Sequence, residues 1–198
     1  MAKVIASITM SLDGYIAGPQ DGPDQGLGIG GERLHYWVFG GPWSSDDPPQ
    51  GGFAGFGAEY LDEVTKRIGA MVVGRWMYES SNHWGERNPF GIPLFVVTHR
   101  PEEEPDSGEF RFVNGLAEAI GQAKEAAGGK DVSLGGGADV IRQGLASGLV
   151  DELALVVAPF TLGGGKSLFD GFEEALEFEP IRTVPSEWAN VLEYRVKR

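Results

Sequence analysis

The stretch 133–145, SLGGGADVIRQGL, carries the feature that decides the fold. Three glycines stand between the apolar run DVSL (131–134) and a segment, 138–145, whose apolar residues follow helical spacing. Glycines let backbone amides turn towards a ligand, and a helix N-terminus carries about half a positive charge. On this cluster alone, the turn indicates either a phosphate site or a tight strand-to-helix turn with close packing.

The same alternation of strand and helix continues along the rest of the chain, which predicts one α/β domain over residues 1–198. The sheet should be mainly parallel. Strands without intervening helices after residue 150 predict an antiparallel C-terminal edge. The predicted strands are 3–11, 70–74, 93–98, 110–114, 131–136, part of 150–169 and the alternating tail 188–198, and the predicted helices are 56–69, a short one after 74, 115–129 and 138–149.

Composition limits the functions that the chain can have. Its net charge of −13 repels nucleic acid and anionic membranes. It contains no cysteine, which excludes disulfides and thiolate catalysis. No apolar run is long enough for a membrane span, and the N-terminus resembles no signal peptide. His35, His83 and His99 lack metal-ligand spacing, so we expect no metal. These features favour a cytoplasmic protein with a small-molecule partner.

Residues 18–57 are rich in glycine and proline, which predicts a flexible insert or lid. The insert contains GLGIGG (26–31), which formally matches the dinucleotide pattern G-x-G-x-x-G. The preceding AGPQDGPDQ cannot form the strand that this pattern needs, so we interpret it as a loop. Trp37 and Trp43 could stack on a flat heterocycle or could form a small core within the insert.

Several predicted strands end in turns or polar residues. Gly74 and Arg75 follow one strand, Thr98 to Arg100 follow another, and TLGGGKSLF (161–169) follows the longest. Ligands of open α/β sheets bind beyond the carboxyl ends of strands. The stretch 161–169 is either a hairpin turn or a loop that closes one end of the same pocket.

The ordered set VVGRWMYES (72–80), PLFVVTHR (93–100) and 133–169 resembles the dihydrofolate reductase-like superfamily. SITMSLDGYIAG (7–18) resembles stand-alone relatives of the reductase domain of bacterial riboflavin biosynthesis. The resemblance implies a three-layer α/β/α fold, an NADPH cofactor and a homodimer. It is not specific to one substrate.

The resemblance also implies where the cofactor binds. Arg75 would bind the ribose 2′-phosphate, and the glycine turn would hold the pyrophosphate. The arginines could equally be surface residues that pair with the many carboxylates. Met77 stands where the family often has a threonine, so one phosphate-binding hydroxyl is missing. The implied cofactor residues are Gly74, Arg75, Met77, Thr98, His99, Arg100, Gly135, Gly136, Gly137, Ala138, Asp139 and Val140.

Two carboxylates are candidates for catalysis. Glu59 lies on the helix before the strand that ends in Gly74, where folate reductases carry their carboxylate, and it is either a proton relay facing the pocket or a solvated residue. Asp13 is either a turn former or a group facing the nicotinamide. Folate reductases carry an arginine shortly before the third strand, and by spacing the matching place here is near Ile92 in PFGIPLF (89–95), which counts against dihydrofolate as substrate. We therefore expect an NADPH-dependent reductase of a pterin-like, pyrimidine-like, carbonyl or imine substrate, or a non-catalytic NADP(H)-binding protein.

Overall fold

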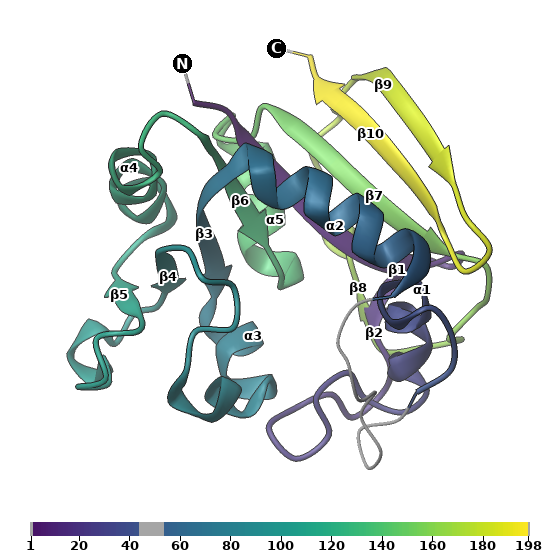
Figure 1. The fold of residues 1–198 in the computed structure, drawn as a ribbon, viewed down its shortest axis with the longest axis horizontal. Helices are drawn as coiled ribbons and strands as arrows, with labels where there is room; N and C mark the ends of the chain where they lie inside the picture. The colour runs from purple at the N-terminus through teal and green to yellow at the C-terminus, as the bar shows by residue number, and fades with distance from the viewer. Residues whose placement is uncertain (1, 44–53, 198) are drawn as a thin grey trace.

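The structure is a computed structural model that describes residues 2–43 and 54–197 (Figure 1). Its main sheet has eight strands in the order β5-β4-β3-β6-β1-β7-β10-β9. The strands are β1 (Val4–Ser11), β3 (Ile68–Gly74), β4 (Leu94–Val97), β5 (Arg111–Val113), β6 (Asp131–Gly135), β7 (Glu152–Ala158), β9 (Phe178–Pro185) and β10 (Asn190–Val196). The pairs from β5 to β7 are parallel, whereas β10 is antiparallel to β7 and to β9. This confirms the predicted parallel sheet with an antiparallel C-terminal edge.

β1 lies inside the sheet between two strands from much later in the chain. Val4 is in register with Val132 of β6, and Ile5 is in register with Glu152 of β7. Because strand side chains alternate between faces, β1 contributes to two cores. Val4 and Ala6 belong to one hydrophobic cluster and Ile5 to another.

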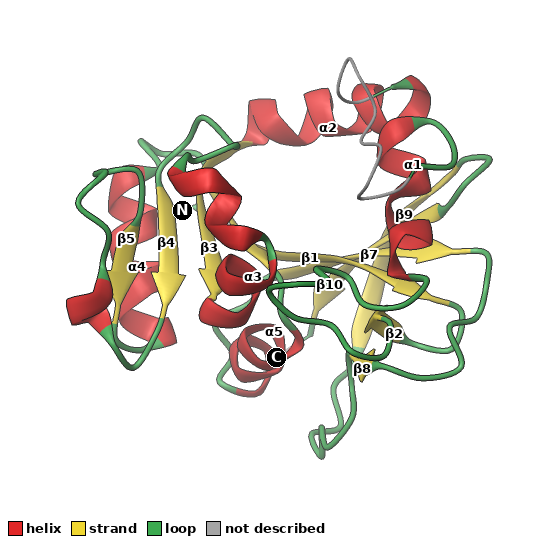
Figure 2. Ribbon diagram, turned by 90° about the horizontal axis from the view of Figure 1, so that it is seen from below, coloured by secondary structure: helices red, strands yellow, loops and turns green. Residues whose placement is uncertain are grey.

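Helices cover both faces of the sheet and give three layers (Figure 2). α4 (Leu116–Ala126) and α5 (Ala138–Ala146) bury their apolar faces in the cluster that holds Val4 and Ala6. On the opposite face α2 (Gly55–Arg67) packs over β1, β7 and β10, and α3 (Arg75–Ser80) packs over β3 and β4. Within the described residues, no helix combines the length and the apolar character needed to span a bilayer.

The segment 18–43 contains helical turns that its composition did not predict. These are η1 (Gly31–His35) and α1 (Tyr36–Phe39). They form because tertiary burial compensates for a glycine-rich sequence: Leu34 is 1% exposed, and the indole of Trp37 donates a hydrogen bond to Thr9 Oγ1 at 3.1 Å. Residues 44–53 of the predicted insert lie outside the described residues.

A second, two-stranded sheet joins two loops at the carboxyl edge of the main sheet. β2 (Tyr15–Ala17) pairs antiparallel with β8 (Lys166–Ser167). The amide of Leu168 also donates to the carbonyl of Gly14 at 2.9 Å. Two short 3₁₀ turns, η2 (Asn82–Glu86) and η3 (Pro101–Glu103), follow α3 and β4 along the chain.

Candidate active site

Two adjoining cavities open at the carboxyl edge of the sheet. The outer cavity, about 340 Å³, lies between the ends of β3 and β4 and the start of α5. The inner cavity, about 300 Å³, lies between the end of β1, β2, α3 and the residues His35 and Trp43. Gly137, Trp76 and Lys166 line both cavities, so a long ligand could pass from one to the other. Every residue that the sequence assigned to a cofactor lines one of them, except Gly135.

The turn between β6 and α5 contains three glycines, and each has different surroundings. A Cβ at Gly135 would overlap Met71 Cε, and one at Gly136 would lie 2.8 Å from Met77 Sδ. Gly135 is therefore a packing residue, although the sequence grouped it with the cofactor residues. A Cβ at Gly137 would meet nothing within 4 Å, and its φ of −88° is open to any residue. Space in front of Gly137 is thus left open towards the cavities.

Gly137 is also the N-cap of α5, and no side chain caps this helix end. The first N–H groups of a helix lack partners within the helix, and the helix dipole favours negative charge there. Ala138, Asp139 and Val140 line the outer cavity at this point. The helix start therefore offers backbone donors to an anionic ligand.

Arg75 faces the outer cavity with one nitrogen unused. Its Nε donates to Glu79 at 2.8 Å, and its Nη2 donates to Glu103 at 2.6 Å. Its Nη1 is buried and has no hydrogen-bond partner among the described residues. Burial opposes the charge of the guanidinium, but the hydrogen bonds to Glu79 and Glu103 raise its pKa. A buried donor without a partner is costly, so this nitrogen fits an acceptor from a ligand.

The end of β4 supplies the neighbouring groups. The Thr98 hydroxyl accepts a hydrogen bond from the backbone N–H of Arg100 at 3.0 Å. The Arg100 side chain donates to Glu103 at 3.0 Å and to Glu79 at 3.4 Å. Both alternatives for the arginines therefore hold together: each pairs with carboxylates, and each lines the outer cavity.

Lys166 is a site residue that the sequence reasoning missed. Its Nζ lies 3.1 Å from Asp21 Oδ2 and 4.3 Å from the centre of the Trp76 ring. Trp76 also donates to Asp21 Oδ2 at 2.7 Å. Lys166 belongs to the stretch 161–169, in which the glycines alone predict a turn or a pocket loop. Only the pairing of β8 with β2 brings its amine to the junction of the cavities.

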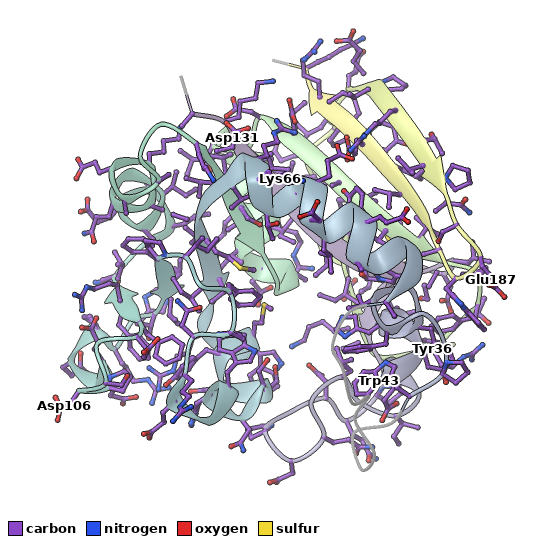
Figure 3. All side chains as sticks on the ribbon, viewed as in Figure 1. Tyr36, Trp43, Lys66, Asp106, Asp131 and Glu187 are labelled. Carbon is purple, nitrogen blue, oxygen red and sulfur yellow. The ribbon has the colours of Figure 1, made fainter. Side chains whose placement is uncertain are left out.

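His35 and Trp43 close one side of the inner cavity. Their rings stack with centroids 6.3 Å apart. Although His35 as a residue is only partly buried, burial of its imidazole lowers the pKa to about 4, so the ring is neutral at pH 7. Trp43, marked in Figure 3, lies in the loop after α1. Trp37, the other predicted stacking residue, lines neither cavity and is a core residue, 6% exposed.

The two carboxylates proposed for catalysis line neither cavity. Glu59 is exposed on α2, because the adjacent Tyr60 takes the buried position towards the sheet. This corrects the expectation that Glu59 faces the pocket. Asp13 accepts hydrogen bonds from the backbone N–H groups of Leu162 and Gly163 at 3.0 and 2.8 Å, as well as from the Ser11 hydroxyl. Its carboxylate is thus used in holding two loops together.

Known proteins resemble this chain in sequence or in fold. The uncharacterized protein YyaP of Bacillus subtilis (strain 168) is 25% identical over 195 residues, which cover 91% of this chain and 87% of that protein. A crystal structure from Shewanella sp. PV-4, which carries a provisional riboflavin biosynthesis name, matches with a TM-score of 0.73 and 25% identity over 100% of both chains. The fold is also that of dihydrofolate reductase from Enterococcus faecalis complexed with NADP(H), at a TM-score of 0.63 and 17% identity over 99% of this chain and 97% of the other.

The family assignment agrees with the fold. The family model that matches the chain spans residues 2–189, which is nearly its whole length, and describes the RibD C-terminal domain. This chain therefore belongs to the RibD C-terminal domain family.

Proposed function

We propose that this protein is an NADPH-dependent reductase that transfers hydride to a small pyrimidine-like or pterin-like heterocycle, or to another carbonyl or imine compound. The observation that carries the proposal is the pair of cavities that meet at Gly137, with open space where any other residue would place a Cβ. A dinucleotide needs such a continuous groove with a close approach to bare backbone at its centre.

The described residues fit the cofactor at both ends of the groove. The unused Nη1 of Arg75 would hold the ribose 2′-phosphate, together with Arg100. Gly137 and the N-terminus of α5 would hold the pyrophosphate, with the nicotinamide end directed to the inner cavity. When bound, NADPH supplies the hydride, and the protein supplies position, charge and exclusion of water.

The inner cavity offers polar groups for a heterocyclic substrate. The neutral imidazole of His35 can donate one hydrogen bond and accept another, and the Nζ of Lys166 is a donor near Asp21. Trp43 presents an aromatic ring beside them. Either His35 or Lys166 could hold the proton that the reduced substrate takes up, in place of the exposed Glu59.

A second function stays open: a protein that binds NADP(H) without catalysis. Two observations favour it, namely the exposure of Glu59 on α2 and the methionine at 77, which provides no hydroxyl to the glycine turn. Both functions require the cofactor groove, and they differ only in what happens in the inner cavity.

Fluorescence titration with NADPH and NADH tests the groove. We expect tighter binding of NADPH, and we expect Arg75→Ala to weaken NADPH binding by about tenfold or more while changing NADH binding little, since a charge-assisted hydrogen bond contributes roughly 1.5–3 kcal/mol. Arg111→Ala is the matched control, because Arg111 is an exposed arginine that pairs with Glu104 outside both cavities.

The same protein then distinguishes the two functions. Oxidation of NADPH is followed with a panel of pyrimidine-like, pterin-like, carbonyl and imine compounds. Turnover of one class supports the reductase, whereas tight NADPH binding with no turnover on the whole panel supports the non-catalytic protein. If neither NADPH nor NADH binds, both proposed functions are overturned.

A further inference from the structure

Glu103 bridges the two arginines of the outer cavity. Its Oε2 accepts from Arg75 Nη2 at 2.6 Å, and its Oε1 accepts from Arg100 Nη1 at 3.0 Å. Glu79 Oε1 also accepts from both arginines, at 2.8 and 3.4 Å. Two guanidinium groups and two carboxylates therefore form one cluster whose formal charges cancel before any ligand binds.

Glu103 is the residue of this cluster whose position best allows its carboxylate to give way to a ligand. The Arg75 side chain is 19% exposed and leans over the ring of Phe112, 4.9 Å from its centre. The Glu103 side chain is 40% exposed and belongs to the short surface turn η3. The hydrogen bond from Arg75 and the charge of Arg100 hold the pKa of Glu103 below its ordinary value of 4.5, so this carboxylate is charged at neutral pH.

A phosphate on the ribose would seek the same donors. Guanidinium groups bind phosphate through paired N–H donors, so the phosphate would use the unused Nη1 of Arg75 together with its Nη2, and Glu103 already occupies that Nη2 and the Nη1 of Arg100. A phosphate arriving here would also meet the negative charge of Glu103. A ribose with a free 2′-hydroxyl carries no such charge and needs no guanidinium.

We propose that Glu103 is a specificity-determining residue, which competes with the 2′-phosphate for Arg75 and Arg100 and so narrows the preference for NADPH over NADH. This inference rests on the proposed function. It predicts that the charge of Glu103 limits the ratio of NADPH affinity to NADH affinity, and that removing this charge increases the ratio.

The test measures binding of NADP⁺ and NAD⁺ by titration calorimetry to the full chain and to E103Q. We expect E103Q to bind NADP⁺ about tenfold more tightly, with NAD⁺ affinity changed less than about twofold. E102Q is the matched control: it removes the same charge from the neighbouring position of the same turn, and no ion pair joins Glu102 to the arginines among the described residues.

Each outcome decides a different point. A selective gain for NADP⁺ in E103Q and not in E102Q supports the inference. An equal gain in both variants would assign the effect to overall charge, and weaker NADP⁺ binding in E103Q would mean that Glu103 positions the arginines for phosphate; either overturns the inference and leaves the proposed function standing. If neither dinucleotide binds to any of the three proteins, the proposed function fails and the inference fails with it.

Discussion

The two glycine triplets, 135–137 and 163–165, look alike in sequence, but the chain requires glycine in them for different physical reasons. In the first, Gly137 has an ordinary φ, and a Cβ there would enter open space. In the second, Gly165 has a φ of +119°, and a Cβ there would overlap the carbonyl oxygen of Ala17. Gly137 leaves room that the chain itself does not use, whereas Gly165 lets two segments of the chain approach each other. Glycine-rich motifs therefore need their contacts before they indicate a ligand.

The largest effect should come from filling the second triplet. Gly165→Ala would place a Cβ 2.6 Å from the Gly18 carbonyl carbon at a backbone conformation that favours glycine, so we expect the free energy of unfolding to fall by about 3 kcal/mol. Urea denaturation measures the change. Gly164→Ala is the control, because its Cβ would meet only Pro19 Cγ at 3.7 Å. Similar losses in both variants would mean that the close approach to Ala17 and Gly18 does not matter.

Gly137 of the first triplet should respond in the opposite way. Gly137→Val fills the open space, so we expect NADPH binding to weaken by at least about tenfold, while the melting temperature falls only modestly, because valine is a poorer N-cap residue than glycine. Gly136→Val should lower both binding and stability, since its Cβ would meet Met77 Sδ at 2.8 Å. Fluorescence titration and thermal unfolding separate the two quantities. Full NADPH binding by a folded Gly137→Val protein would show that this space serves no dinucleotide.

A smaller effect concerns the carboxylate that holds the second triplet in place. The hydrogen bond from Ser11, followed by those from the Gly163 and Leu162 amides, lowers the pKa of Asp13 below 3.8. The stabilisation is therefore present above pH 3.8 and is lost as the pH falls through the lower folded-state value. We expect Asp13→Asn to lower the melting temperature at pH 7 by less than Gly165→Ala does.

The acidic limit of this effect provides its check. The difference in stability between the natural chain and Asp13→Asn should shrink as the pH falls below 3.8 and should end below the lower folded-state pKa of Asp13, where this side chain is protonated in both the folded and the unfolded state. Denaturant titrations across this range measure the difference. A difference that does not depend on pH would assign the effect to the shape of the turn instead of the charge of Asp13.

Local sequence patterns predicted the strands and long helices of this fold. They did not predict the features that depend on tertiary contacts. Apolar runs and helical spacing located the parallel strands and the long helices, and the carboxyl ends of those strands located the groove. Glu59 stands beside the buried Tyr60 on α2 and is itself exposed. Resemblance to folate reductases nevertheless directed it to the pocket.

The missed features depend on partners far away in sequence. Lys166 reaches the junction of the cavities only through the pairing of β8 with β2, about which its own neighbours carry no information. The helical turns of 31–39 form around Leu34 and Trp37, which are buried by contacts with other parts of the fold. No propensity in so short a segment predicts them.

The place of β1 in the sheet has a consequence for how the chain folds. β1 is made early in synthesis, yet its partners β6 and β7 begin at residues 131 and 152. Until those residues have been synthesised, both edges of the apolar segment that forms β1 lack their partner strands. Parallel pairing over such separations is slow, and exposed strands of this kind promote aggregation. We therefore expect the sheet of this protein to form late and in one cooperative step. We also expect its folding to depend strongly on chaperones that bind the incomplete chain.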